Sequence, residues 1–147
     1  TPAGNIVTGS PISDLNPIFL SSKTLFTLSS LEPSSDRIVL SESFWTGYRQ
    51  NCCKETEILK NIFIPCSKQG QFSRAYKQAK RRDDDIAIVN AGLSVLLDDD
   101  NKVKEASFAF GGMSWVTVRA PESENFVLGK KWGNQNVLND LLEKLCE

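Results

Sequence analysis

The stretch Ala87-Ile88-Val89-Asn90-Ala91-Gly92-Leu93-Ser94-Val95-Leu96-Leu97 decides the fold of this 147-residue chain. Apolar side chains recur at every second position, which puts them on one face of an extended strand. These residues are Ala87, Val89, Ala91, Leu93, Val95 and Leu97. A polar turn at 98–102 follows, and Val103–Phe110 then alternates again, with Ala106, Phe108 and Phe110 on one face. The two stretches predict an antiparallel hairpin.

The segments on either side of this hairpin extend the sheet and then end in helices. Strands are predicted over 24–28 and 37–40 as an antiparallel pair, then over 57–64, 72–79 and 115–118. From about Ser123 the pattern becomes helical, and Asn134 or Asn136 is placed to cap the last helix. The apolar residues at helical spacing are Val137, Leu138, Leu141, Leu142 and Leu145. This order predicts an α+β fold, with a boundary near 67–71.

Aromatic residues are the expected anchors of the core. Phe44, Trp45 and Tyr48 lie together and are predicted to face it. Trp115 and Trp132 are expected to serve as core or domain-contact residues.

Composition excludes several functions. The net charge of −1 and pI near 5.6 lack the basic character typical of proteins that bind nucleic acid or an anionic membrane. The chain has no histidine, which removes Ser-His-Asp and Cys-His catalysis and every histidine-based metal site. Its four cysteines form no C-x-x-C pair, so we expect reduced thiols and no metal. Any chemistry therefore uses other residues or a bound cofactor.

The opening stretch Gly4–Pro17 is a dense set of small polar groups with two glycines and two prolines. We expect a polar loop, which is either an ordinary surface turn or a place where a cofactor approaches the backbone. Within it, Asp14 either caps a local helix, which the sequence favours, or accepts hydrogen bonds from ligand hydroxyls. Two later segments have the same two interpretations: the charge run Lys80–Asp85 and the turn Gly111-Gly112-Met113.

Four motifs follow one another in this chain: Gly4–Pro17, Phe44–Arg49, Tyr76–Ala87 and Phe110–Met113. In this order they closely resemble the flavin-binding region of the eukaryotic xanthine dehydrogenase family of molybdenum hydroxylases. The resemblance runs from Gly4 to about Thr117 and is looser beyond it. It implies that residues 1–69 are the end of a PCMH-type FAD-binding domain. It further implies that residues 70–147 resemble a CO dehydrogenase flavoprotein C-terminal domain, a mostly antiparallel sheet followed by helices.

The resemblance also implies which residues contact FAD. Val7 is expected against the isoalloxazine ring and Leu59 near the adenine end, while the others make polar contacts. The full expected set is Gly4, Asn5, Val7, Thr8, Ser13, Asp14, Leu59 and Lys77. A mobile loop maps to Gln78–Ile88, in which Arg81 and Asp84 are expected to tune the flavin. An acid near the ring disfavours negative charge on it and a base favours such charge.

In that family, electrons pass from 2Fe-2S clusters through FAD to NAD or oxygen while a purine is hydroxylated at molybdopterin-bound molybdenum. The iron–sulfur motifs and the molybdenum residues are missing from this sequence, so we expect them in other parts of a longer, homodimeric chain. The expected location is cytoplasmic, with a peroxisomal one open. The alternatives are an aldehyde oxidase flavin domain and a non-catalytic fragment that keeps the flavoprotein fold.

Overall fold

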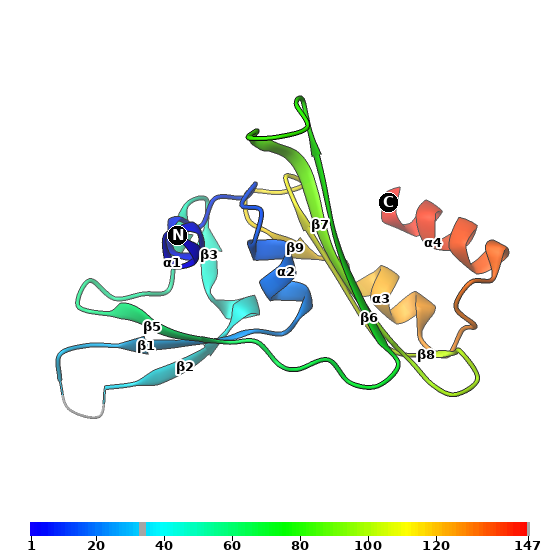
Figure 1. The fold of residues 1–147 in the computed structure, drawn as a ribbon, viewed down its shortest axis with the longest axis horizontal. Helices are drawn as coiled ribbons and strands as arrows, with labels where there is room; N and C mark the ends of the chain where they lie inside the picture. Colours follow the sequence, from blue (N-terminus) through cyan, green and yellow to red (C-terminus); the bar gives the residue numbers. More distant parts are fainter. Residues whose placement is uncertain (33–34, 147) are drawn as a thin grey trace.

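A computed structural model describes residues 1–32 and 35–146 (Figure 1). Its elements are α1 (Pro2–Thr8), α2 (Asn16–Ser21), β1 (Leu25–Ser29), β2 (Arg37–Leu40), the 3-10 helix η1 (Ser41–Ser43), β3 (Trp45–Gly47), β4 (Gln50–Asn51), β5 (Ile58–Phe63), β6 (Gln71–Ala79), β7 (Ala87–Leu97), β8 (Val103–Gly111), β9 (Val118–Arg119), α3 (Pro121–Val127) and α4 (Gln135–Cys146). The strands form antiparallel sheets in the orders β2-β1-β5, β3-β4 and β6-β7-β8-β9. The predicted α+β class is confirmed.

The β7–β8 hairpin forms as predicted, with Asn90 opposite Gly111 and Leu97 opposite Val103. Its apolar face packs against α3 and α4 in a core that contains Val95, Val103, Phe108, Val127 and Leu141. The opposite face of β7 is covered as well, because α2 packs against it. There Asn90 and Ser94 are buried, and a Cβ on Gly92 would lie 2.3 Å from the Pro17 carbonyl oxygen. The hairpin is therefore the layer between α2 and the C-terminal helices (Figure 1).

A second core lies under the three-stranded sheet and is built on aromatic rings. Phe26 makes edge-to-face contacts with Phe19, Phe44 and Trp45 at centroid distances of 4.8–5.9 Å. The Trp45 indole also donates a hydrogen bond to the Ile6 carbonyl at 3.0 Å. The predicted anchoring roles of Phe44 and Trp45 are thus confirmed.

Three other aromatic residues do not lie in the core. Tyr48 is 60% exposed, since it lies at the turn between β3 and β4 rather than in either strand. Trp115 is 62% exposed and Trp132 38% exposed, so the core alternative is wrong for both, and a domain-contact role stays a prediction. Both belong to connections between elements, where a ring has no packed layer above it.

The expectation that Gly4–Pro17 is one loop is also wrong, because Pro2–Thr8 forms α1 and Asn16–Ser21 forms α2. The Thr1 hydroxyl caps α1 by accepting a hydrogen bond from the Gly4 amide at 3.3 Å, and Pro2 occupies the first turn. Gly9 then ends the helix with φ 60°, the left-handed conformation that suits glycine. Only residues 9–15 remain a loop.

The C-terminal segment is close to expectation. β9 covers 118–119, so it overlaps the predicted 115–118 strand at residue 118 alone. Asn134, rather than Asn136, caps the start of α4, since its side chain accepts a hydrogen bond from the Asn136 amide at 2.9 Å. Among the described residues, no helix has the length and apolarity needed to cross a membrane.

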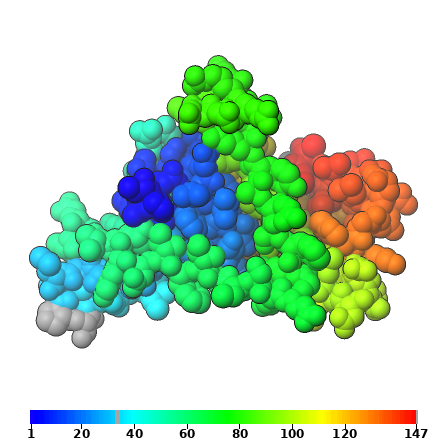
Figure 2. All heavy atoms as spheres, viewed as in Figure 1, coloured from blue at the N-terminus to red at the C-terminus, as the bar shows by residue number. Residues whose placement is uncertain are grey.

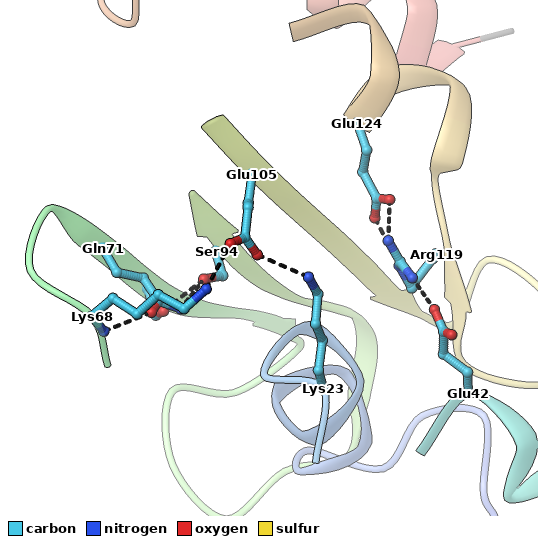
Figure 3. A network of polar contacts seen from close by, with 9 residues as sticks. Lys23, Glu42, Lys68, Gln71, Ser94, Glu105, Arg119 and Glu124 are labelled. Atoms are coloured by element: carbon cyan, nitrogen blue, oxygen red, sulfur yellow. Dashed lines mark hydrogen bonds and ion pairs between the residues drawn. The ribbon is translucent and has the colours of Figure 1, made fainter. Parts of the chain in front are cut away.

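An ion-pair network ties this segment to the first sheet (Figure 3). Arg119 on β9 pairs with Glu124 on α3 and with Glu42 on η1. Glu124 is buried and its carboxylate also accepts a hydrogen bond from the Phe108 amide at 2.7 Å. The two parts of the fold are therefore joined by the exposed Arg119–Glu42 ion pair as well as by α2.

Candidate cofactor-binding site

Lys77 on β6 joins the loop at 9–15 to the charged loop that follows β6. Its ammonium lies 2.9 Å from an Asp14 carboxylate oxygen and donates to the Asp85 carbonyl oxygen at 2.6 Å. The favoured sequence interpretation of Asp14, a helix cap, is wrong because its carboxylate pairs with Lys77 and no side chain caps α2 from Leu15. Two of the predicted site residues, 63 positions apart, are thus brought into direct contact.

Ser13 anchors the same loop on both of its sides. Its hydroxyl donates to the Asn5 side-chain oxygen, so α1 and the loop are joined. Its carbonyl accepts a hydrogen bond from the Asn90 side chain at 2.9 Å, which fixes the loop on β7. Asn90 was not predicted from the sequence, although a buried amide at 5% exposure inside an otherwise apolar strand is a signal for such a role.

The glycine pair Gly111-Gly112, at the end of β8, lets this loop approach the sheet. A Cβ on Gly111 would lie 2.1 Å from the Asn90 side-chain oxygen and 2.8 Å from the Pro11 carbonyl. Gly112 has φ +84° and donates its amide to the Pro11 carbonyl at 2.9 Å. The two glycines therefore serve the close packing of the loop against β7 and β8.

The remaining predicted residues divide into two groups. Gly4, Val7 and Thr8 lie on the exposed side of α1, where Val7 leaves 37% of its surface open. Leu59 lies on β5, partly buried against the aromatic core. The structure thus links Asn5 to Ser13 and Asp14 to Lys77, and it places Leu59 in a different sheet.

The charged loop after β6 is held in shape by Asp85, the last of its three acidic residues. The Asp85 carboxylate accepts hydrogen bonds from the amides of Arg81 at 2.8 Å and Ile86 at 2.9 Å. Arg81 donates from its guanidinium to the Asp84 carbonyl at 3.2 Å, and Asp84 has φ 50°. This hairpin tip projects beyond the rest of the fold (Figures 1 and 2), with the Arg81 and Asp84 side chains exposed. Asp85, which was not predicted as a site residue, therefore sets the shape of the loop.

The strongest electrostatic perturbation lies outside this region. The Arg37 guanidinium contacts both oxygens of Glu57, at 2.7 and 2.8 Å, and with the Lys54 amide it lowers the pKa of that carboxyl to about 2. Burial raises the pKa of the nearby Cys53 thiol. These groups belong to the three-stranded sheet and the loop before β5, so they are structural rather than part of the candidate site.

A hollow of about 800 Å³ lies between the β6-β7-β8 sheet and the C-terminal helices. Tyr76, Val89 and Phe110 line it, and Lys77 lies at its border. Tyr76 points into the hollow, whereas Lys77, the next residue of β6, points to the other face of the sheet and contacts the 9–15 loop. The hollow therefore opens mainly on the face opposite that loop. Within the described residues, no cluster of acidic and cysteine side chains could hold a metal ion. The polar contacts around Lys77 therefore define the candidate site.

Comparison with known families identifies the class of protein. Residues 1–67 match the FAD binding domain in molybdopterin dehydrogenase, and residues 74–147 match the CO dehydrogenase flavoprotein C-terminal domain. The chain therefore belongs to the flavoprotein domains of the molybdopterin dehydrogenases, as its sequence motifs predicted.

Two curated relatives are similar to this chain over nearly its whole length. The chain is 42% identical over 146 residues to the xanthine dehydrogenase of Emericella nidulans, covering 99% of this chain and 11% of the relative. It is also 42% identical over 144 residues to the xanthine dehydrogenase/oxidase of Gallus gallus, covering 97% of this chain and 10% of the relative. The chain thus spans about a tenth of the length of these curated relatives.

Solved structures share the fold. A carbon monoxide dehydrogenase chain from Hydrogenophaga pseudoflava superposes with a TM-score of 0.86 at 20% identity, covering 96% of this chain and 47% of that one. Quinoline 2-oxidoreductase from Pseudomonas putida 86 superposes with a TM-score of 0.82 at 17% identity, covering 98% of this chain and 48% of that one. The predicted combination of antiparallel sheet and C-terminal helices is confirmed.

Proposed function

We propose that this chain carries FAD within a larger oxidoreductase of the xanthine dehydrogenase type. The observation that supports this most is the ion pair between Asp14 and Lys77, two residues that the family motifs assign to the cofactor. The proposed binding set is the one expected from the motifs: Gly4, Asn5, Val7, Thr8, Ser13, Asp14, Leu59 and Lys77. FAD would supply electron transfer, and the chain would bind and orient it.

The chemistry of these side chains fits a cofactor that has an apolar ring at one end and hydroxyls and phosphates along its length. Val7 offers an exposed apolar side chain and Thr8 a neighbouring hydroxyl on the same helix. Asp14 accepts hydrogen bonds from hydroxyl groups, and the Lys77 ammonium attracts negative charge. The Ser13 contacts with Asn5 and Asn90 hold these groups in place without a ligand.

The proposal includes a division of the chain into 1–69 and 70–147, which the two family matches on either side of residues 68–73 support. It also includes tuning of the flavin by Arg81 and Asp84. In support of this role, Asp85 fixes the backbone of the loop while the Arg81 and Asp84 side chains stay exposed.

The rest of the proposed enzyme lies outside these residues. Electrons would come from 2Fe-2S clusters and a molybdopterin centre, and NAD or oxygen would accept them from FAD in a cytoplasmic homodimer. The exposed face of the three-stranded sheet supports a larger assembly. There Ile38, Leu40, Ile58 and Phe63 are each more than half exposed, an apolar surface that another part of the enzyme would cover.

The FAD content of the intact native protein tests the proposal. Lys77→Met removes the ammonium and is expected to lower the bound FAD per chain, measured by absorbance after purification. Lys60→Met is the matched control, since Lys60 also forms a surface ion pair, with Asp36 at 2.7 Å. The exchange Asp14→Lys with Lys77→Asp keeps an ion pair but reverses its charges, so it should also lose FAD. Wild-type FAD content in both site variants would refute the assignment.

A further inference from the structure

A polar pocket of about 290 Å³ lies between the end of α2, the segment 64–68 and one face of the β6-β7-β8 sheet. The pocket lies on the same face of the sheet as the candidate site around Lys77. The helix α2 packs on the sheet between the pocket and that site. Its volume is at the lower end of the roughly 300–1,000 Å³ typical of small-molecule sites. The pocket therefore has room for a small group rather than for a second flavin.

Two lysines converge at this pocket (Figure 3). Lys23 follows α2 and reaches one Glu105 carboxylate oxygen at 3.0 Å, while Lys68 reaches the other oxygen at 2.6 Å. Together the three side chains leave one net positive charge at the pocket wall. An ammonium carries three N–H donors, and each of these two contacts uses one. Donors therefore remain for a further acceptor beside Glu105.

The inner wall of the pocket carries a buried hydroxyl with no protein partner. Ser107 is 2% exposed, and within residues 1–32 and 35–146 its oxygen makes no hydrogen bond. Its cross-strand neighbour Ser94 is buried as well, but it accepts hydrogen bonds from Gln71 and Ser73, both at 3.0 Å. Leaving a buried hydroxyl unpaired is costly, so such a group in a pocket wall indicates a bound partner.

The geometry points to a phosphate-type oxyanion as the ligand of this pocket, held by Lys23, Lys68 and the Ser107 hydroxyl. Ammonium and hydroxyl groups are the donors that phosphate oxygens take in proteins, and the surplus positive charge favours an anion over a cation. Glu105 opposes the anion and limits its affinity, while it keeps the two lysines together when the pocket is free. The phosphate is either a free ion or the end group of a larger molecule.

Calorimetric titration of the intact native protein tests this assignment, with inorganic phosphate in one arm and adenosine monophosphate in the other. Joint replacement Lys23→Met and Lys68→Met should weaken binding by about tenfold or more, as expected for losing charge-assisted hydrogen bonds. Lys60→Met, at a surface ion pair in the other sheet, should bind as the wild type does. Binding in either arm supports the pocket. Binding of phosphate alone identifies a free ion, whereas tighter or exclusive binding of adenosine monophosphate identifies the end group of a larger molecule.

Two single changes separate ligand binding from structure. Ser107→Ala should lower the affinity several-fold and leave thermal stability unchanged, because the hydroxyl makes no hydrogen bond to any residue that the structure describes. Glu105→Gln should raise the affinity several-fold, because a like charge beside the anion is removed. The assignment is overturned if neither phosphate nor adenosine monophosphate binds, or if the Lys23/Lys68 variant binds like the Lys60 control. It is also overturned if Ser107→Ala binds phosphate as tightly as the wild type.

Discussion

Replacing Gly92 by alanine tests the contact that positions the candidate site. A Cβ at this position would lie 2.3 Å from the Pro17 carbonyl oxygen and 2.8 Å from the Ile18 amide nitrogen. Both atoms are backbone atoms of α2, so no side chain can rotate away. An ordinary contact requires α2 to withdraw by about 1 Å from β7, in an interior packed as densely as a crystal.

The expected cost is about 3 kcal/mol, at the upper end of the usual range for overpacking a core. For a chain of this size, that loss lowers the unfolding temperature by about 10 °C. Urea unfolding of the 147-residue chain, followed by the fluorescence of the buried Trp45, measures the loss in the free energy of unfolding. The withdrawal of α2 would also move Asp14, two residues before the helix, away from Lys77.

Gly4→Ala is the matched control, because it adds the same methyl group within α1. There the added Cβ meets only the Thr1 hydroxyl at 3.1 Å, and alanine is favoured over glycine in a helix by roughly 0.5–1 kcal/mol. We expect this variant to be as stable as the wild type or slightly more stable. If Gly92→Ala unfolds within about 0.5 kcal/mol of the wild type, the packing of α2 on β7 is not as described.

Three further predictions concern charged groups. Arg119→Met leaves the Glu124 carboxylate buried without its partner and should cost about 3 kcal/mol in urea unfolding, whereas Arg119→Lys should recover part of that loss. The pKa of Glu57 is lowered from 4.5 to about 2 in the folded chain, so its contribution to stability is complete above about pH 4.5 and is lost as the pH falls toward 2. Glu57→Gln should therefore flatten the fall in stability measured over that acid range, and an unchanged pH profile would contradict the pairing with Arg37. Under the proposed function, Asp84→Ala in the intact protein should shift electrons from NAD toward oxygen, and unchanged NAD reduction and oxygen consumption would refute that role.

Strong periodicity made the sheet predictable. The alternation in β7 and β8 and the helical spacing in α4 are local properties, and the corresponding elements formed with nearly the predicted bounds. The helix α1 was missed because its glycine and proline content suggested a loop, although Thr1, Pro2 and Gly9 are also start and stop signals for a helix.

The tertiary contacts of the site could not be predicted from local patterns. Lys77 and Asp14 meet only because α2 lies on β7, which depends on glycine at position 92. The role of Asn90 depends on the same packing, since its partner is a backbone carbonyl 77 residues earlier. The exposure of Tyr48 and Trp115 likewise follows from where the connections run, and residue type alone does not reveal that.

Hydrogen exchange of the intact protein, with FAD bound and after its removal, tests the central claim most directly. If residues 4–14 and Lys77 hold the cofactor, the amides of 4–14 and of the 77–86 segment should exchange more slowly when FAD is bound. The amides of β2, on the far edge of the three-stranded sheet, should then be unaffected. Equal exchange at 4–14 and 77–86 in the two forms would contradict the claim that these segments bind FAD.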